Sequence, residues 1–181
     1  MNYLDTFLEI LKYILPSVVV LIATFLIVNK FLVTETRKKQ LAVFQDGLKA
    51  SLHLRLLAYE RLAIFVERIS PRSLIVRLYQ SNMTVKDLQI AAVHAIREEF
   101  EHNLSQQIYV STQVWGTVQS IKEQQLVMIN QMASTLNPDA SAKELHKMIL
   151  DYIMTTEDKL PTDIALEVIN NEAKLVLSQS A

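Results

Sequence analysis

The chain has 181 residues, a formal net charge of -1 and no cysteine, and half of its residues are hydrophobic. The absence of cysteine excludes disulfides and thiolate chemistry, which fits a reducing compartment. The presence of only two glycines excludes glycine-rich phosphate-binding loops and most tight hairpin turns. Because helix breakers are scarce, the sequence predicts an all-α protein.

The first predicted element is a short interfacial segment over residues 1–12. Its apolar residues recur at helical spacing, and its acidic residues fall elsewhere on the helix. These apolar residues are Leu4, Phe7, Leu8 and Leu11. We expect this segment to lead directly into the most apolar part of the chain.

Residues 13–33 form the longest apolar stretch of the sequence, and Lys30 is the only charged residue within it. A bilayer core about 30 Å thick needs roughly 20 mostly apolar helical residues, and a helix satisfies its own backbone there. Pro16 falls near the start of this helix, where a missing N–H costs little. The stretch therefore predicts a single transmembrane helix.

Two other interpretations of residues 13–33 remain open, a buried core helix and a cleaved signal peptide. A core helix is usually shorter than a membrane span. A signal peptide has a basic N-terminal region and a small-residue cleavage site. Here Asp5 and Glu9 precede the stretch and no Ala-x-Ala pattern follows it, which favours an uncleaved anchor.

Residues 34–53 are predicted to form a basic juxtamembrane helix. Basic residues next to a span remain on the cytoplasmic side, so we expect a short N-terminal tail outside and a large C-terminal part in the cytoplasm. The membrane-proximal basic residues are Lys30, Arg37, Lys38 and Lys39. An apolar stripe in the same helix could form a coiled-coil seam or a bundle face. It contains Leu41, Phe44, Leu48 and Leu52.

Charge is unevenly distributed along the chain. Residues 34–97 carry eleven basic and five acidic side chains, whereas residues 98–181 carry five basic and twelve acidic ones. The basic half could be attracted to anionic lipid, at about 1 kcal/mol per basic residue near the surface, or the two halves could neutralise each other within one bundle. Nucleic-acid binding is disfavoured, because the basic residues alternate with apolar ones and lack stacking aromatic neighbours.

Residues 54–178 are predicted to form a cytoplasmic bundle of about five or six helices. The expected helices cover residues 54–69, 73–80, 84–103, 111–137, 141–153 and 161–177, with a connector over 104–110. Capping patterns mark three of the helix starts. They are Thr84 with Asp87, Ser111 alone, and Ser141 with Glu144.

One pair of opposite charges occurs twice in the helix expected over residues 54–69. Glu60-Arg61 is repeated seven residues later as Glu67-Arg68, and none of the four has an oppositely charged residue three or four positions away. Their partners must therefore be water or another helix. We expect the two arginines to pair with an acidic cluster in the helix over 84–103. The predicted ion-pair network consists of Arg61, Arg68, Glu98, Glu99, Glu101 and His102.

The same acidic cluster allows a second interpretation, as a metal site. Glu99 and His102 have the Glu-x-x-His spacing of carboxylate di-metal bundles, and His94 lies four residues before Glu98, on the same helical face. A di-metal site needs a second Glu-x-x-His, and the sequence has no second copy. The ion-pair interpretation is therefore preferred, and no catalytic, cofactor-binding or metal-binding residue is assigned.

Three stretches carry a resemblance to a known family: residues 58–62 (AYERL), 67–71 (ERISP) and 99–111 (EFEHNLSQQIYVS). With them, nearly the whole chain resembles a family of uncharacterised bacterial membrane proteins that have one N-terminal span and a helical cytoplasmic region. The resemblance implies a location in the bacterial inner membrane. It implies no activity, cofactor or site residue.

The expected function is that of a non-enzymatic, membrane-anchored helical interaction module, such as an adaptor, a scaffold or an accessory subunit of an inner-membrane complex. Its expected partners are the lipid bilayer and a membrane protein or a second copy of the chain, with no nucleic acid, small-molecule substrate or cofactor. Two alternatives remain. One is a binder of anionic lipid surfaces, and the other is a membrane-tethered metal-dependent enzyme that uses His94, Glu98, Glu99 and His102.

Overall fold

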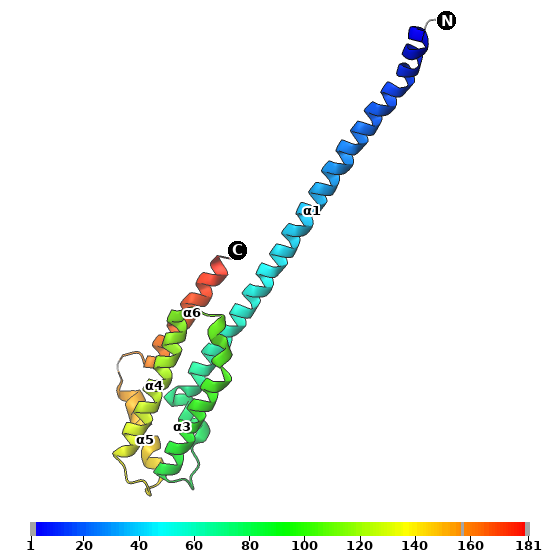
Figure 1. Ribbon diagram of the computed structural model, residues 1–181. Helices are drawn as coiled ribbons and strands as arrows, with labels where there is room; N and C mark the ends of the chain where they lie inside the picture. The colour runs from blue at the N-terminus through cyan, green and yellow to red at the C-terminus, as the bar shows by residue number, and fades with distance from the viewer. Residues whose placement is uncertain (1–2, 157, 180–181) are drawn as a thin grey trace. The chain divides into compact units, whose positions relative to one another are not determined.

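Figure 1 shows the computed structural model of the chain, which describes residues 3–156 and 158–179. These residues form six α-helices and one short 3₁₀ helix, so the all-α prediction is confirmed. The elements are α1 (Tyr3–Ile69), α2 (Pro71–Leu78), α3 (Val85–His102), η1 (Leu104–Ile108), α4 (Thr112–Ser134), α5 (Ala142–Thr155) and α6 (Pro161–Ser178). Contacts divide the chain into two compact units, one up to Ala50 and one from Ser51 onward.

Helix α1 is longer than the sequence indicated. The sequence predicts an interfacial segment, a span whose helix continues through residues 34–53, and a further helix over residues 54–69. The structure has one uninterrupted helix, and Pro16 lies inside it rather than near its start. Between Pro16 and Pro71 there is no other proline, and the single glycine, Gly47, costs about 1 kcal/mol and does not end the helix. The helix ends at Ile69, because the residue before Pro71 avoids the α conformation.

The first unit is the N-terminal part of α1, and its apolar side chains are exposed. Every side chain from Leu11 to Thr34 lies at the surface. By length and composition the helix could cross a membrane, although a signal sequence would meet the same criterion. Of the four apolar residues on the interfacial face expected for residues 1–12, Phe7 and Leu11 are exposed, and the side chains of Leu4 and Leu8 lie outside the described ones.

The second unit is a helical bundle with two adjoining hydrophobic clusters. The larger cluster joins residues of α1, α2, α3, α4 and α6, and the smaller one joins residues of α2, α3, α4 and α5. Phe65 of α1 is fully buried in the larger cluster, with its ring centroid 6.1 Å from that of Phe100 on α3. Phe100 in turn stacks on Trp115 of α4 at 5.6 Å. These aromatic contacts connect three helices that are distant in sequence.

The capping predictions for α3 and α4 are confirmed. The Thr84 hydroxyl accepts from the amide of Asp87, and the Asp87 carboxylate accepts from the amide of Thr84. The hydroxyl of Ser111 accepts from the amide of Val114 at 3.2 Å. Local side-chain bonds therefore set both helix starts, as the sequence pattern indicated.

At α5 the capping prediction is only partly right. The Ser141 hydroxyl accepts from the amide of Lys143, and the reciprocal bond to Glu144 of a capping box is not formed. An isolated β-bridge between Thr84 and Ser141 ties this helix start to that of α3. The backbone around Ser141 is thus positioned by a tertiary contact, which sequence spacing alone does not reveal.

Candidate functional site

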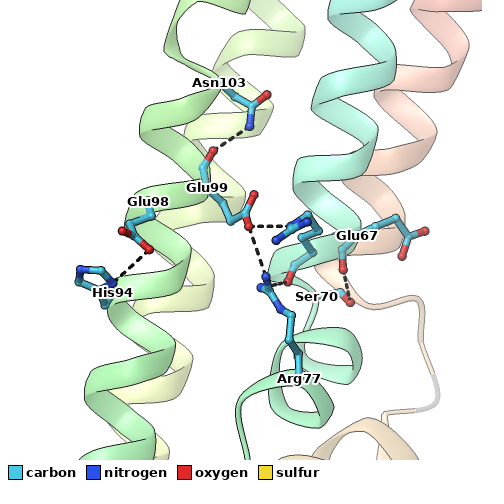
Figure 2. Close-up of polar contacts among 8 residues, drawn as sticks. Glu67, Ser70, Arg77, His94, Glu98, Glu99 and Asn103 are labelled. Carbon is cyan, nitrogen blue, oxygen red and sulfur yellow. Dashed lines mark hydrogen bonds and ion pairs between the residues drawn. The ribbon is translucent and has the colours of Figure 1, made fainter.

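A polar network joins the ends of α1 and α2 to the C-terminal part of α3 (Figure 2). The Nε of Arg68 lies 2.6 Å from Oε1 of Glu99, and the Nη1 of Arg77 lies 3.3 Å from the same oxygen. Arg77 also donates from Nη2 to the carbonyl oxygen of Arg68 at 3.2 Å. The Glu99 side chain is only 18% exposed, so this carboxylate is a largely shielded acceptor that holds three helices together.

The structure brings together only some of the residues in the predicted network. Arg68 meets Glu99, whereas the side chains of Arg61, Glu101 and His102 make no ion pair or hydrogen bond among the described residues. Successive helical residues point about 100° apart, so neighbouring acids of α3 cannot all face α1. Arg77 is the partner that the sequence did not indicate.

Glu98 points to a different side of α3. Its Oε2 lies 3.3 Å from Nδ1 of His94, one turn earlier on the same helix. Figure 2 shows this pair on one side of α3 and Glu99 on the side facing α1 and α2. In the part of the chain that the structure describes, no three histidine, aspartate or glutamate side chains converge to hold a metal ion. The residues of the metal hypothesis are therefore not gathered around one point.

A second polar network, which the sequence did not indicate, joins α1, α4 and α6. The hydroxyl of Tyr59 donates to Oε1 of Glu172 at 2.6 Å, and the amide of Ser111 donates to the same oxygen at 3.0 Å. The Ser111 hydroxyl donates to the other carboxylate oxygen. Arg55 donates to the Tyr59 hydroxyl from Nη2, at 3.3 Å, and to the carbonyl of Tyr109 from Nε, at 3.3 Å.

The environment of this second network shifts two pKa values in opposite directions. Burial acts to raise the pKa of Glu172, but hydrogen bonds from Ser111 and Tyr59, with the nearby charge of Arg55, outweigh it and lower the pKa. Burial and the hydrogen bond to Glu172 raise the pKa of the Tyr59 phenol. At neutral pH the network therefore consists of a carboxylate that accepts hydrogen bonds from neutral donors, with the positive charge of Arg55 nearby.

Only one feature of the sequence points to the second network. The sequence predicts that Ser111 caps a helix, and a helix N-terminus stabilises a nearby acidic group. Which acid takes this place cannot be read from local spacing, because Glu172 is 61 residues from Ser111 and 113 from Tyr59.

The four basic residues predicted to lie next to a membrane, Lys30, Arg37, Lys38 and Lys39, are all on α1 within the first unit, and their side chains are exposed. The Nζ of Lys38 lies 3.5 Å from Oε1 of Glu35, one turn earlier. Among the described residues, Lys30, Arg37 and Lys39 have no ion pair. Their charges therefore face the surroundings of the helix.

Comparison with protein families gives a match over most of the chain. A family model described as "Family of unknown function (DUF7935)" matches residues 5–176. No curated protein and no solved structure matches the chain. Because the match covers most of the sequence, from the first turn of α1 to the last turns of α6, the chain belongs to this family of unknown function.

Proposed function

We propose that the protein is a non-enzymatic interaction module anchored in the bacterial inner membrane by α1, with its helical bundle in the cytoplasm. The observation that carries this proposal is the exposed apolar surface of residues 13–33. A core helix of a water-soluble protein buries such a surface, whereas none of this stretch is buried. A lipid bilayer is the environment in which an exposed apolar helix of this length is stable.

The polar groups in the apolar stretch support the same proposal. Ser17 donates to the carbonyl of Ile14 at 2.7 Å, and Thr24 donates to the carbonyl of Val20 at 2.8 Å. Both hydroxyl protons are thus satisfied within the helix, as hydrocarbon surroundings require. Lys30 is near the end of the stretch, where a long side chain can extend its ammonium to the headgroups.

The proposed orientation rests on the basic residues after the span. Arg37, Lys38 and Lys39 are exposed, and basic residues within a few turns of a span stay on the cytoplasmic side. The same charges favour contact with anionic headgroups. The bundle would then lie in the cytoplasm.

The proposed interaction role rests on how the bundle uses its shielded carboxylates. Glu99 accepts from two arginines and Glu172 accepts from a tyrosine and a serine. Both acids join helices to each other, which is a structural use of charge. An adaptor, a scaffold or an accessory subunit needs such a folded surface at the membrane and no reacting groups.

Alkaline carbonate washing of membranes tests the anchor. We expect the full chain to stay with the membrane pellet, and intact-mass measurement to show that residues 1–33 are retained. Release into the wash, or loss of the N-terminal segment, would contradict the proposal.

A matched pair of variants makes this test specific. Ile22→Arg puts a charge at the middle of the span, where it costs about 2.5–3.5 kcal/mol in helix insertion. Val43→Arg puts the same charge on an exposed apolar position beyond residues 13–33. We expect Ile22→Arg to reduce the membrane-inserted fraction and Val43→Arg to leave it unchanged.

A further inference from the structure

Within the bundle, the surface of α1 opposite the core carries a regular pattern. We call this surface the outer face of α1, made of Leu57, Glu60, Arg61, Ile64, Glu67 and Arg68, all of which are exposed. Leu62, Phe65, Val66 and Ile69 on the other side of the helix are fully buried. The buried side chains on the opposite side of α1 therefore fix the outer face in position on the bundle.

The outer face has an apolar centre between an acidic and a basic flank. At 3.6 residues per turn, Leu57 and Ile64 lie about 20° apart around the helix. Glu60 lies about 60° to one side of Leu57 and Arg61 about 40° to the other. Glu67 and Arg68 repeat this arrangement seven residues later.

The charged groups of this face are largely without partners inside the chain. Among the described residues, Glu60 and Arg61 make no side-chain hydrogen bond or ion pair, and Arg68 engages Glu99 only through Nε. Figure 2 shows the Glu67 carboxylate directed away from Glu99. Leu57 and Ile64 are 41% and 49% exposed, and Ile64 borders a hollow of about 430 Å³ beside Ala63 and Leu166.

We propose that a second copy of this chain packs on the outer face of α1, with the two α1 helices parallel. Leu57 and Ile64 of each copy meet at the centre, and the acidic flank of each helix lies against the basic flank of the other. Glu60 then faces Arg61 of the second copy, and Glu67 faces Arg68. The symmetry of the pair forms each of these contacts twice.

The charge pattern selects the parallel arrangement. A two-fold axis parallel to the helices exchanges the flanks, so acid meets base on both sides of the seam. An antiparallel two-fold pairing in the same interface keeps each flank on its own side, so that acid meets acid and base meets base. Parallel pairing also follows from a shared membrane orientation, and to that extent this inference rests on the proposed function.

Single-cysteine crosslinking of the full chain in its native membranes tests the proposal directly, because the protein has no cysteine of its own. Leu57→Cys and Ile64→Cys lie at the centre of the seam, and Val76→Cys is the control, since Val76 is a 70% exposed position on α2. We expect mild oxidation to give disulfide-linked dimers with the first two variants several-fold faster than with the control. Equal rates for all three would overturn the proposal.

Mixing differently tagged variants separates the two orientations. In a parallel pair each position meets its own counterpart, so Leu57→Cys and Ile64→Cys crosslink with themselves and not with each other. Predominant Leu57–Ile64 crosslinks would overturn the parallel arrangement.

Charge reversal tests the flanks. In the Leu57→Cys background, Glu60→Lys or Arg61→Glu places like charges together, and we expect each to lower the dimer yield about two- to fivefold per contact. Coexpression of one chain carrying Glu60→Lys with another carrying Arg61→Glu makes both contacts attractive again, so the yield should recover in the mixed dimer. A mixed dimer as weak as either single variant would contradict the proposed pairing.

The carbonate wash, applied to the same samples, distinguishes this inference from the proposed function. Protein that stays in the pellet but crosslinks no better at Leu57 than at Val76 overturns the dimer and leaves the anchor intact. Protein that is released overturns the anchor, and crosslinking and charge recovery in the released material then still decide the dimer.

Discussion

Glu172 shows how a single carboxylate can connect distant parts of a small bundle. It accepts hydrogen bonds from Tyr59 on α1 and from Ser111 at the start of α4, and it belongs to α6. Charged acceptors form stronger hydrogen bonds than neutral ones. The Tyr59 and Ser111 donors would lose a charged partner if the charge of Glu172 were removed.

We therefore expect Glu172→Gln to lower the free energy of unfolding by about 1–3 kcal/mol. Denaturant unfolding of the full chain in detergent measures this, with Trp115, the only tryptophan, as the fluorescent reporter. Glu101→Gln is the matched control, because Glu101 is exposed and bonds to no side chain in the described residues. An equal loss in both variants would show that the Glu172 contacts contribute nothing specific.

The lowered pKa of Glu172 makes this contribution pH-dependent. Its folded pKa lies below the ordinary value of 4.5, so the unfolded chain takes up this proton first as the pH falls. The contribution is complete above pH 4.5 and is lost as the pH falls through the folded pKa. The stability difference between wild type and Glu172→Gln should therefore shrink on acidification from pH 6 to pH 3, and a constant difference would contradict this origin.

At the scale of single elements, α4 contains a glycine that its conformation does not require. Gly116 is exposed, its φ is not positive, and a Cβ added there meets no atom within 4 Å. Glycine inside a helix costs about 0.5–1 kcal/mol relative to alanine. Nothing in the packing of the bundle offsets this cost.

Gly116→Ala is therefore expected to raise the free energy of unfolding by about 0.5–1 kcal/mol. The same fluorescence-detected unfolding measures it. A lower free energy of unfolding would contradict this prediction and would mean that α4 requires a residue without a side chain at position 116.

For the molecule as a whole, the proposed orientation in the membrane should depend on three charges. Replacing Arg37, Lys38 and Lys39 together by Glu removes the basic residues next to the proposed span, and we expect this to lower the fraction of chains with the C-terminus in the cytoplasm. A reporter fused after Ala181 measures that fraction.

Lys143→Glu combined with Lys147→Glu is the control for this prediction. Both residues lie on α5, far along the chain from the proposed span, where charge has little influence on topology. An equal change of orientation in both sets would point to net charge rather than position.

The elements that have a local cause can be predicted from the sequence. Apolar periodicity identified the helices, the Thr84 and Ser111 patterns identified two helix starts, and the uncharged run after residue 12 identified the exposed apolar helix. Helix capping and amphipathic periodicity depend on neighbours within a few residues, so local spacing carries the information. The sequence does not predict the full length of α1. No proline or glycine lies near residue 54, and the absence of such a residue is a weaker signal for a continuous helix than its presence is for a break.

Which charges meet depends on the tertiary structure. Of the acidic residues in the predicted network, Glu99 alone pairs with one of its two arginines, Arg68, and it also pairs with Arg77, which lies outside the predicted network. The contact between Glu172 and Tyr59 spans 113 residues and has no local signature. Such pairings depend on how each helix is rotated about its axis and how closely it packs on its neighbours. Both follow from the packing of all buried side chains in the bundle, and no single stretch of sequence contains that information.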